Sequence, residues 1–239
     1  MPLGQPDFVG IGAQKAATTW LFKRLSMHPE IYFPRGKEIH FWDRRDKLNI
    51  PINSYKRTFD GVQIEHIGGK TGEITPAYLL LSDKRITELR KLAPDLRLMV
   101  ILRNPVDRAI SAAAQVLRNR GSGLGRANPL FSKNTTSGGL YGQHLGRWLS
   151  HFPRNQLHVI SHEEIRQDAR AVLQKTSEHL GVDPEVYNLI DRTLLESRTS
   201  PTPNRLEISP EQRARLAETY RADVEHLQNL LQRDFGWNL

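Results

Sequence analysis

The sequence has no cysteine among its 239 residues. This absence excludes disulfide bonds, zinc sites built from thiolates, and a cysteine nucleophile. Long apolar runs are absent too, since no window approaches the roughly 20 apolar residues that cross a bilayer. The first ten residues, MPLGQPDFVG, lack the basic and apolar blocks of a signal peptide. We therefore expect a cytoplasmic protein with no membrane span.

The composition is that of a folded protein with an excess of basic residues. Hydrophobic residues make up 38% and charged residues 25%, which argues against a disordered chain, and the length predicts one domain over residues 1–239. The formal net charge of +8 favours anionic partners such as nucleotides, acidic glycans or nucleic acid. Basic and acidic residues alternate in segments such as residues 83–91, as on solvated helix faces, so charge alone selects none of these partners.

Short apolar stretches alternate with amphipathic ones along the chain. This alternation predicts an α/β fold in which a mainly parallel, P-loop-like β-sheet is flanked by helices on both faces. A long mobile loop is expected at 119–139, which is rich in Gly, Asn, Ser and Thr. The expected strands are 7–13, 72–75, 96–103 and 157–161, and the expected helices are 18–28, 83–92, 106–117, 141–152, 168–180 and 210 to about 234.

The segment QKAATT, residues 14–19, lies where the first strand leads into a helix. At such a bend the unpaired N–H groups and the helix dipole favour an anion. Lys15 adds a positive charge, the two alanines keep the backbone approachable, and the two threonines offer hydroxyl donors. The pattern predicts a phosphate site.

This segment is not an ordinary nucleoside-triphosphate loop. The Walker A pattern requires a glycine directly before the lysine, and the residue before Lys15 is Gln14. The strand at 96–103 ends in Arg103, at a position where a nucleotide site that uses magnesium would have an acidic ligand for the metal. A site that builds positive charge from side chains has less need of a metal, so we expect none.

A second anion motif is LRNPVDRAIS, residues 102–111. Arg103 ends the expected strand, and Ser111 lies about two turns along the helix that follows. The guanidinium fork suits two phosphate oxygens, so these residues can jointly hold a second phosphate. Two phosphate sites at adjacent strand ends indicate a nucleotide phosphorylated at two separated positions.

Together these motifs resemble the sulfotransferases that use 3′-phosphoadenosine 5′-phosphosulfate (PAPS), especially the heparan sulfate glucosaminyl O- and N-sulfotransferase branch. The resemblance covers nearly the whole chain. The family's 5′-phosphosulfate loop is similar to QKAATTW (14–20), its catalytic segment to KEIHFWD (37–43), and its EKTPAYF motif to GEITPAYL (72–79). The 3′-phosphate motif is similar to residues 102–111, and the following helix and strand to residues 138–165.

The resemblance implies a PAPS-dependent sulfotransferase that acts without a metal. Such an enzyme transfers the sulfuryl group to a hydroxyl, or an amine, of a carbohydrate or glycosylated small-molecule acceptor. It releases adenosine 3′,5′-bisphosphate, and nucleic acid is not an implied partner. The resemblance assigns Glu38 as the general base, and His40, on the same side of an extended strand, as its assistant.

The resemblance also assigns the donor site. It implies that Lys15 contacts the 5′ phosphosulfate bridge and takes part in catalysis. The further residues implied to bind the donor are Ala16, Ala17, Thr18, Thr19 and Trp20 at its 5′ end, Arg103 and Ser111 at its 3′ phosphate, and Arg198 in the loop over the nucleotide.

Two positions depart from the family pattern. Ile74 stands where the family's EKTPAYF motif has a lysine that contacts acidic substrates. The segment ESRTSPTP (196–203) stands where these relatives carry a KGRxHP loop, and Arg198 is the one plausible counterpart there.

Three other interpretations stay open on the residues alone. The first is a P-loop kinase-like phosphotransferase, and the second is a non-catalytic binder of acidic polymers that uses the basic surface. The third concerns KEIHFWD, which taken by itself indicates a strand end with a packed aromatic pair. Acceptor choice is expected to lie in 37–64, 119–141 and 198–205, where Trp42 and Tyr141 are expected to pack more than to stack on an acceptor.

Overall fold

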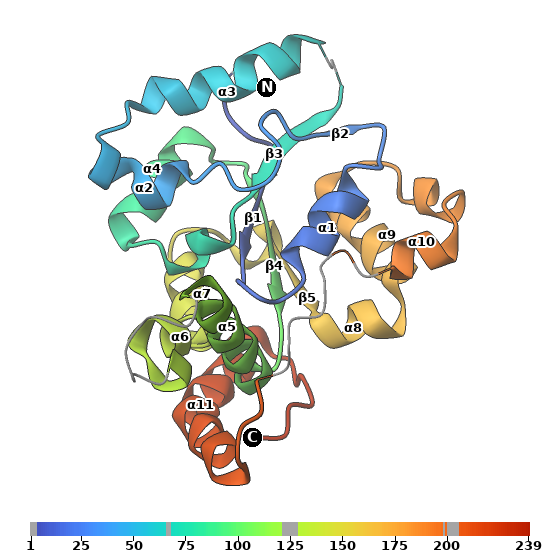
Figure 1. Cartoon of the computed structure of the whole chain (residues 1–239). Coiled ribbons are helices and arrows are strands. Elements are labelled where there is room, and N and C mark those ends of the chain that lie inside the picture. The colour runs from blue at the N-terminus through green and yellow to red at the C-terminus, as the bar shows by residue number, and fades with distance from the viewer. Residues whose placement is uncertain (1–3, 66–67, 121–128, 198, 200–205) are drawn as a thin grey trace.

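The computed structural model describes residues 4–65, 68–120, 129–197, 199 and 206–239. At its centre is a five-stranded sheet whose strands all pair in parallel. The strand order is β2-β3-β1-β4-β5 (Figure 1). The strands are β1 (Phe8–Gly12), β2 (Ile31–Tyr32), β3 (Lys70–Ile74), β4 (Arg97–Leu102) and β5 (Leu157–Ser161).

Helices cover both faces of the sheet, as the sequence predicts (Figure 1). In this view α1 and α8 to α10 lie on one side of the strands, and α4 to α7 lie on the other with α11 beyond them. The helices are α1 (Thr18–Leu25), α2 (Phe41–Leu48), α3 (Ile52–Glu65), α4 (Asp83–Leu92), α5 (Pro105–Arg120), α6 (Lys133–Ser137), α7 (Tyr141–Leu149), α8 (His162–Gln167), α9 (Ala169–Leu180), α10 (Arg192–Glu196) and α11 (Pro210–Leu231). Within the described residues no helix is long and apolar enough to span a membrane.

The core is built around β1 and β4, the two strands whose carboxyl ends carry the candidate site. All five residues of β1 are buried, as are the five from Leu98 to Leu102 in β4. A strand that is buried on both faces is apolar at nearly every position instead of alternating with polar residues. The continuous apolar run within 96–103 therefore predicted this strand from the sequence. Gly10 of β1 faces Ile74 of β3 so closely that a Cβ there would lie 2.8 Å from the Ile74 side chain.

Helix boundaries follow the capping signals in the sequence. The last helix, α11, begins at Pro210 after a capping box formed by Ser209 and Gln212, as expected. The helix expected at 83–92 forms with these bounds, with Ser82 as its N-cap.

The expectation of a long mobile loop at 119–139 is wrong for its described part. Residues 121–128 lie outside the described residues, but the segment that follows forms a 3₁₀ turn, η3 (Pro129–Phe131), and helix α6. Ser132 caps α6 by accepting a hydrogen bond from the Thr135 N–H, and the Thr135 side chain is buried. The buried Arg108 side chain donates to the Thr135 carbonyl. The polar composition of this segment gave no sign of its helical structure, which tertiary contacts such as the Arg108 hydrogen bond stabilise.

Candidate active site

The first half of the site is the loop between β1 and α1. Lys15 and Ala17 both have left-handed backbone conformations, with φ of 68° and 71°. Each such conformation costs a residue with a Cβ about 1–2 kcal/mol. Ala17 is the N-cap of α1 and supplies no side-chain hydrogen bond. The Trp20 N–H donates to the Ala17 carbonyl. The N–H groups of Thr18 and Thr19 are therefore the ones available to an anion, whose charge the helix dipole favours.

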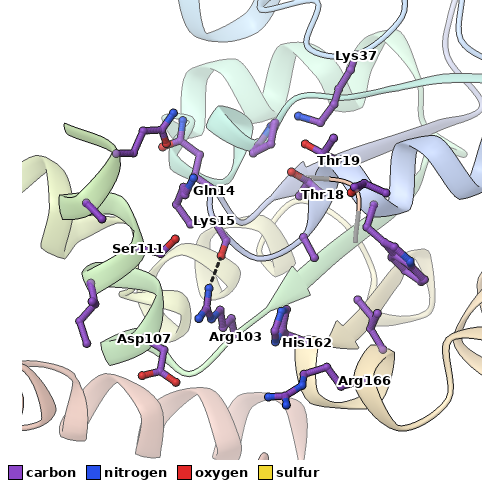
Figure 2. Close-up of a pocket in the computed structure, with 18 of the residues that line it drawn as sticks. Gln14, Lys15, Thr18, Thr19, Lys37, Arg103, Asp107, Ser111, His162 and Arg166 are labelled. Carbon is purple, nitrogen blue, oxygen red and sulfur yellow. Dashed lines mark hydrogen bonds between the residues drawn. The ribbon is translucent and has the colours of Figure 1, made fainter. Parts of the chain in front are cut away.

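The second half of the site is the loop between β4 and α5. Arg103 follows β4 directly, and its Nη1 donates to the Lys15 carbonyl at 3.3 Å (Figure 2). The hydroxyl of Tyr141 donates to the Arg103 carbonyl at 3.0 Å. The Asn104 side chain accepts from the Val106 N–H at 3.0 Å and so caps α5. The structure thus fixes Arg103 beside Lys15, as expected for loops that follow neighbouring parallel strands.

A cavity of about 1070 Å³ lies between these two loops. This size is slightly above the range of about 300–1,000 Å³ for small-molecule sites. Ala16 does not line it, because its side chain is fully buried in the core and its N–H donates to the Ala13 carbonyl. His40 does not line it either, and Arg198 lies outside the described residues. The expected site residues that do line the cavity are Lys15, Ala17, Thr18, Thr19, Trp20, Glu38, Arg103 and Ser111.

Positive charge is concentrated around Lys15. Its pKa is lowered first by burial, and then by the charges of Arg118, Arg103 and Lys37. These cations repel one another, and a multiply charged anion that binds between them offsets this repulsion. The cavity is therefore suited to a phosphorylated ligand.

Several lining residues were not singled out from the sequence. Figure 2 shows His162 and Arg166 on the opposite side of the cavity from Ser111. They belong to α8, which begins at the carboxyl end of β5. Arg118 lies seven residues after Ser111 on α5, so helical periodicity could have placed both on one face. Burial and then the charge of Arg103 lower the pKa of His162, which favours its neutral form.

The carboxylate of Glu38 is held by basic neighbours. The Lys37 ammonium pairs with Oε1, and the His40 Nε2 lies 3.2 Å from Oε2. Burial raises the pKa of Glu38, but the hydrogen bonds and charges of Lys37 and His40 outweigh it, so the net pKa is lowered. His40 also contacts Asp43 through its Nδ1, at 2.8 Å from Oδ2. Glu38 is ionised at neutral pH, and His40 links it to a second carboxylate that the sequence analysis did not single out.

The extended strand expected for Glu38 and His40 is wrong. Glu38 has φ of 68° and His40 has φ of 56°, and α2 begins at the next residue, Phe41. His40 reaches Glu38 because the backbone turns, not because alternate side chains share a strand face. The Glu38 N–H donates to the Ile74 carbonyl of β3 at 3.1 Å.

The aromatic residues and Ile74 lie in the core. Trp42 and Tyr141 are 1% and 0% exposed, as expected for packing residues. Ile74 is also fully buried and does not line the cavity. A side chain at this position faces Gly10 of β1 and offers nothing to an acidic acceptor.

The parallel sheet, and the cation-lined cavity at the carboxyl ends of β1 and β4, define a P-loop-like α/β protein with a candidate anion site. The model of the sulfotransferase domain family matches residues 5–221. The chain therefore belongs to the sulfotransferase domain family, as the sequence resemblance predicted.

Known proteins similar to this chain carry sulfotransferase names. Human "Heparan sulfate glucosamine 3-O-sulfotransferase 3B1" is 32% identical over 98% of this chain and 65% of the human protein, so the chain spans about two thirds of that relative. The crystal structure of a sulfotransferase from Alicyclobacillus acidocaldarius is 28% identical with a TM-score of 0.76 over 98% of both chains. The sulfotransferase domain from the curacin biosynthetic pathway, at 13% identity, covers 92% of this chain and 99% of that domain with a TM-score of 0.56, and shares the fold alone.

Proposed function

We propose that this protein is an enzyme that transfers a sulfuryl group from PAPS to a hydroxyl of a glucosamine-containing carbohydrate of the heparan sulfate type. The observation that carries the proposal is that Lys15 and Arg103, from neighbouring loops, line one cavity together with Glu38. Family membership and the acceptor named for the human relative support the choice of donor and acceptor.

The residues around Lys15 fit the donor. PAPS supplies the sulfuryl group and carries anionic groups at both its 5′ and 3′ positions. Lys15 and the hydroxyls of Thr18 and Thr19 would hold the 5′ end at the start of α1, and Arg103 with Ser111 would hold the 3′ phosphate. Lys15 then stabilises the charge that develops on the leaving phosphate in the transition state.

Glu38 accepts the proton of the acceptor hydroxyl in this proposal. An ionised carboxylate is the form that a general base needs, and the lowered pKa of Glu38 supplies it at neutral pH. His40 lies between Glu38 and Asp43, so it orients the Glu38 carboxylate and helps it to carry the proton. Lys37, on the other oxygen of Glu38, also lines the cavity.

The experiment is an incubation with ³⁵S-labelled PAPS and a panel of acceptors that includes an N-sulfated heparan sulfate oligosaccharide, simple sugars and phenols. We expect label in the oligosaccharide and an equal release of adenosine 3′,5′-bisphosphate. ATP turnover that depends on magnesium would instead favour a kinase-like phosphotransferase. Salt-sensitive binding of the oligosaccharide with no transfer, unchanged in Glu38→Gln, would favour a non-catalytic binder of acidic polymers.

The roles given to the site residues are predictions, and so are three further parts of the assignment. They are the cytoplasmic location, the lack of a metal requirement, and the role of Arg198 over the nucleotide. If no metal is required, we expect the enzyme to keep its activity in the presence of EDTA.

A further inference from the structure

The turn that carries Glu38 and His40 is strained. Both residues have left-handed φ values, and neither is a glycine. Residues with a Cβ stay in this region only where the surrounding structure fixes them. The contacts that hold the two ends of the turn therefore decide whether Glu38 faces the cavity.

Each end of the turn is held by a hydrogen bond to its backbone. At its start, the Glu38 N–H donates to the Ile74 carbonyl at 3.1 Å. At its end, the hydroxyl oxygen of Tyr78 accepts from the N–H of Phe41 at 3.0 Å and from the N–H of Trp42 at 3.3 Å. These two N–H groups are the first of α2, where a helix has no backbone acceptor of its own.

The Tyr78 hydroxyl is oriented by a buried carboxylate. It donates to Glu73 Oε1 at 3.2 Å, and the same carboxylate accepts from the hydroxyls of Tyr55 at 2.6 Å and Thr75 at 2.7 Å. A hydroxyl has one proton to donate and two lone pairs, so a Tyr78 that donates to Glu73 has both lone pairs free for the two N–H groups of α2. Glu73 is fully buried in β3 and does not line the cavity, so the mechanism above does not use it.

We propose that Tyr78 is a positioning residue for catalysis, oriented by Glu73, and that it fixes the Glu38–His40 turn by capping the start of α2. The proposal rests on the proposed function, because Glu38 acts as a base only there. The aromatic packing of this region does not need the hydroxyl. Phe41 stacks on Tyr55 at 4.8 Å between ring centroids, and Trp42 lies 5.3 Å from the same ring.

The test compares two substitutions that each remove one hydroxyl from Glu73. Tyr78→Phe removes the acceptor for the two α2 N–H groups, whereas Tyr55→Phe removes a hydroxyl that donates to Glu73 and lies beside the Trp42 side chain but does not accept from these N–H groups. A third variant, Tyr187→Phe, removes a buried hydroxyl that donates to the Arg24 carbonyl away from this turn. For each variant we would measure melting temperature, the Kd for adenosine 3′,5′-bisphosphate, and kcat and KM with PAPS and the heparan sulfate oligosaccharide.

We expect Tyr78→Phe to lower kcat roughly 10- to 100-fold, the loss expected for a misplaced catalytic group, with the Kd for the bisphosphate within about twofold. Tyr55→Phe and Tyr187→Phe are expected to keep kcat within about twofold even where they melt earlier. A folded Tyr78→Phe with wild-type kcat overturns the proposal. So does an equal loss of kcat in Tyr55→Phe, since the effect would then come from Glu73 and not from the cap on α2.

Hydrogen exchange tests the same inference without any turnover. The amides of Phe41 and Trp42 are expected to exchange at least tenfold faster in Tyr78→Phe and at the wild-type rate in Tyr55→Phe. Wild-type exchange in Tyr78→Phe contradicts the proposal whether or not the enzyme is active. If wild-type protein transfers no sulfuryl group, the proposed function fails by itself and exchange still decides the capping role.

A fourth variant covers the case in which Tyr78→Phe does not fold. Glu73→Leu keeps much of the volume of the side chain, but it has no oxygen to accept from the hydroxyls of Tyr78, Tyr55 and Thr75. We expect faster exchange at Phe41 and Trp42 and a lower kcat in this variant, again with an unchanged Kd for the bisphosphate. Wild-type values for both quantities would show that Glu73 does not orient Tyr78.

Discussion

Glu38 is the residue on which the proposed chemistry depends most. Its carboxylate has basic neighbours on both oxygens, which keep it ionised at neutral pH. We expect Glu38→Gln to lower kcat by about 10²- to 10⁴-fold, the contribution of a positioned base, because the amide cannot accept the proton. Calorimetric Kd values for adenosine 3′,5′-bisphosphate are the control and should stay near wild type. Full turnover in this variant would remove Glu38 from the base role.

Glu73 gives a residue-scale prediction about stability and pH. Burial raises its pKa from 4.5 to about 7, against the hydrogen bonds of Tyr55, Thr75 and Tyr78, which lower it. The folded state therefore binds this proton more tightly than the unfolded chain does. Its contribution to stability is complete below about pH 4.5 and is lost as the pH rises through about 7.

The measurement is urea unfolding of wild-type protein and Glu73→Gln between pH 5 and 8. The free energy of unfolding of wild type is expected to fall relative to the variant as the pH rises to about 7, by up to ~3 kcal/mol, and then to level off. A difference between the two proteins that does not change with pH would mean that Glu73 titrates normally.

At the scale of the elements, the strand-to-helix units were predictable and their exceptions have physical causes. The helix α4, the strand β5 and the start of α11 lie where apolar periodicity and capping residues indicate. Strand β2 has two residues, which is too short to leave a pattern. The turn before α2 was missed because the hydroxyl of Tyr78, 36 residues farther along the chain from Trp42, caps the helix.

The part of the candidate site that lies at the ends of strands was predictable from the sequence. Lys15 and Arg103 follow two adjacent parallel strands, so their approach follows from topology alone. Arg118 shares a face of α5 with Ser111 and could have been singled out from helical spacing. Asp43 was missed because a strand was expected at His40, where α2 begins and brings the residue three positions on into contact. Ala16 was misplaced because one residue of a tight loop must point into the core.

The end of α9 provides an element-scale prediction. Gly181 ends this helix with φ of 74°, and its N–H donates to the Ser177 carbonyl at 2.8 Å. A Cβ at Gly181 would meet nothing within 4 Å, so Gly181→Ala costs only backbone strain. We expect a loss of about 1 kcal/mol in the free energy of unfolding, with a smaller loss in Gly181→Asn, because Asn tolerates this conformation better. Equal stability of all three proteins in urea would contradict this conformation at the helix end.

At the scale of the whole molecule, the chain has a net charge of +8, and several of its basic side chains gather around one cavity. A diffuse basic surface would bind any acidic polymer, with an affinity that falls steeply with salt. The convergence of Lys15, Arg103, Arg118 and Lys37 on one cavity instead favours a compact polyanion. The prediction of one domain over the whole chain stays a prediction, although one sheet carries both halves of the site.

The most direct test of the account is a calorimetric titration of the protein with adenosine 3′,5′-bisphosphate. We predict one site per chain, with binding weakened about 10- to 100-fold in Lys15→Ala and in Arg103→Ala, because each loses a charged hydrogen bond to a different phosphate. Binding that is absent in wild type, or unchanged in both variants, would contradict the claim that the loops after β1 and β4 hold opposite ends of one nucleotide.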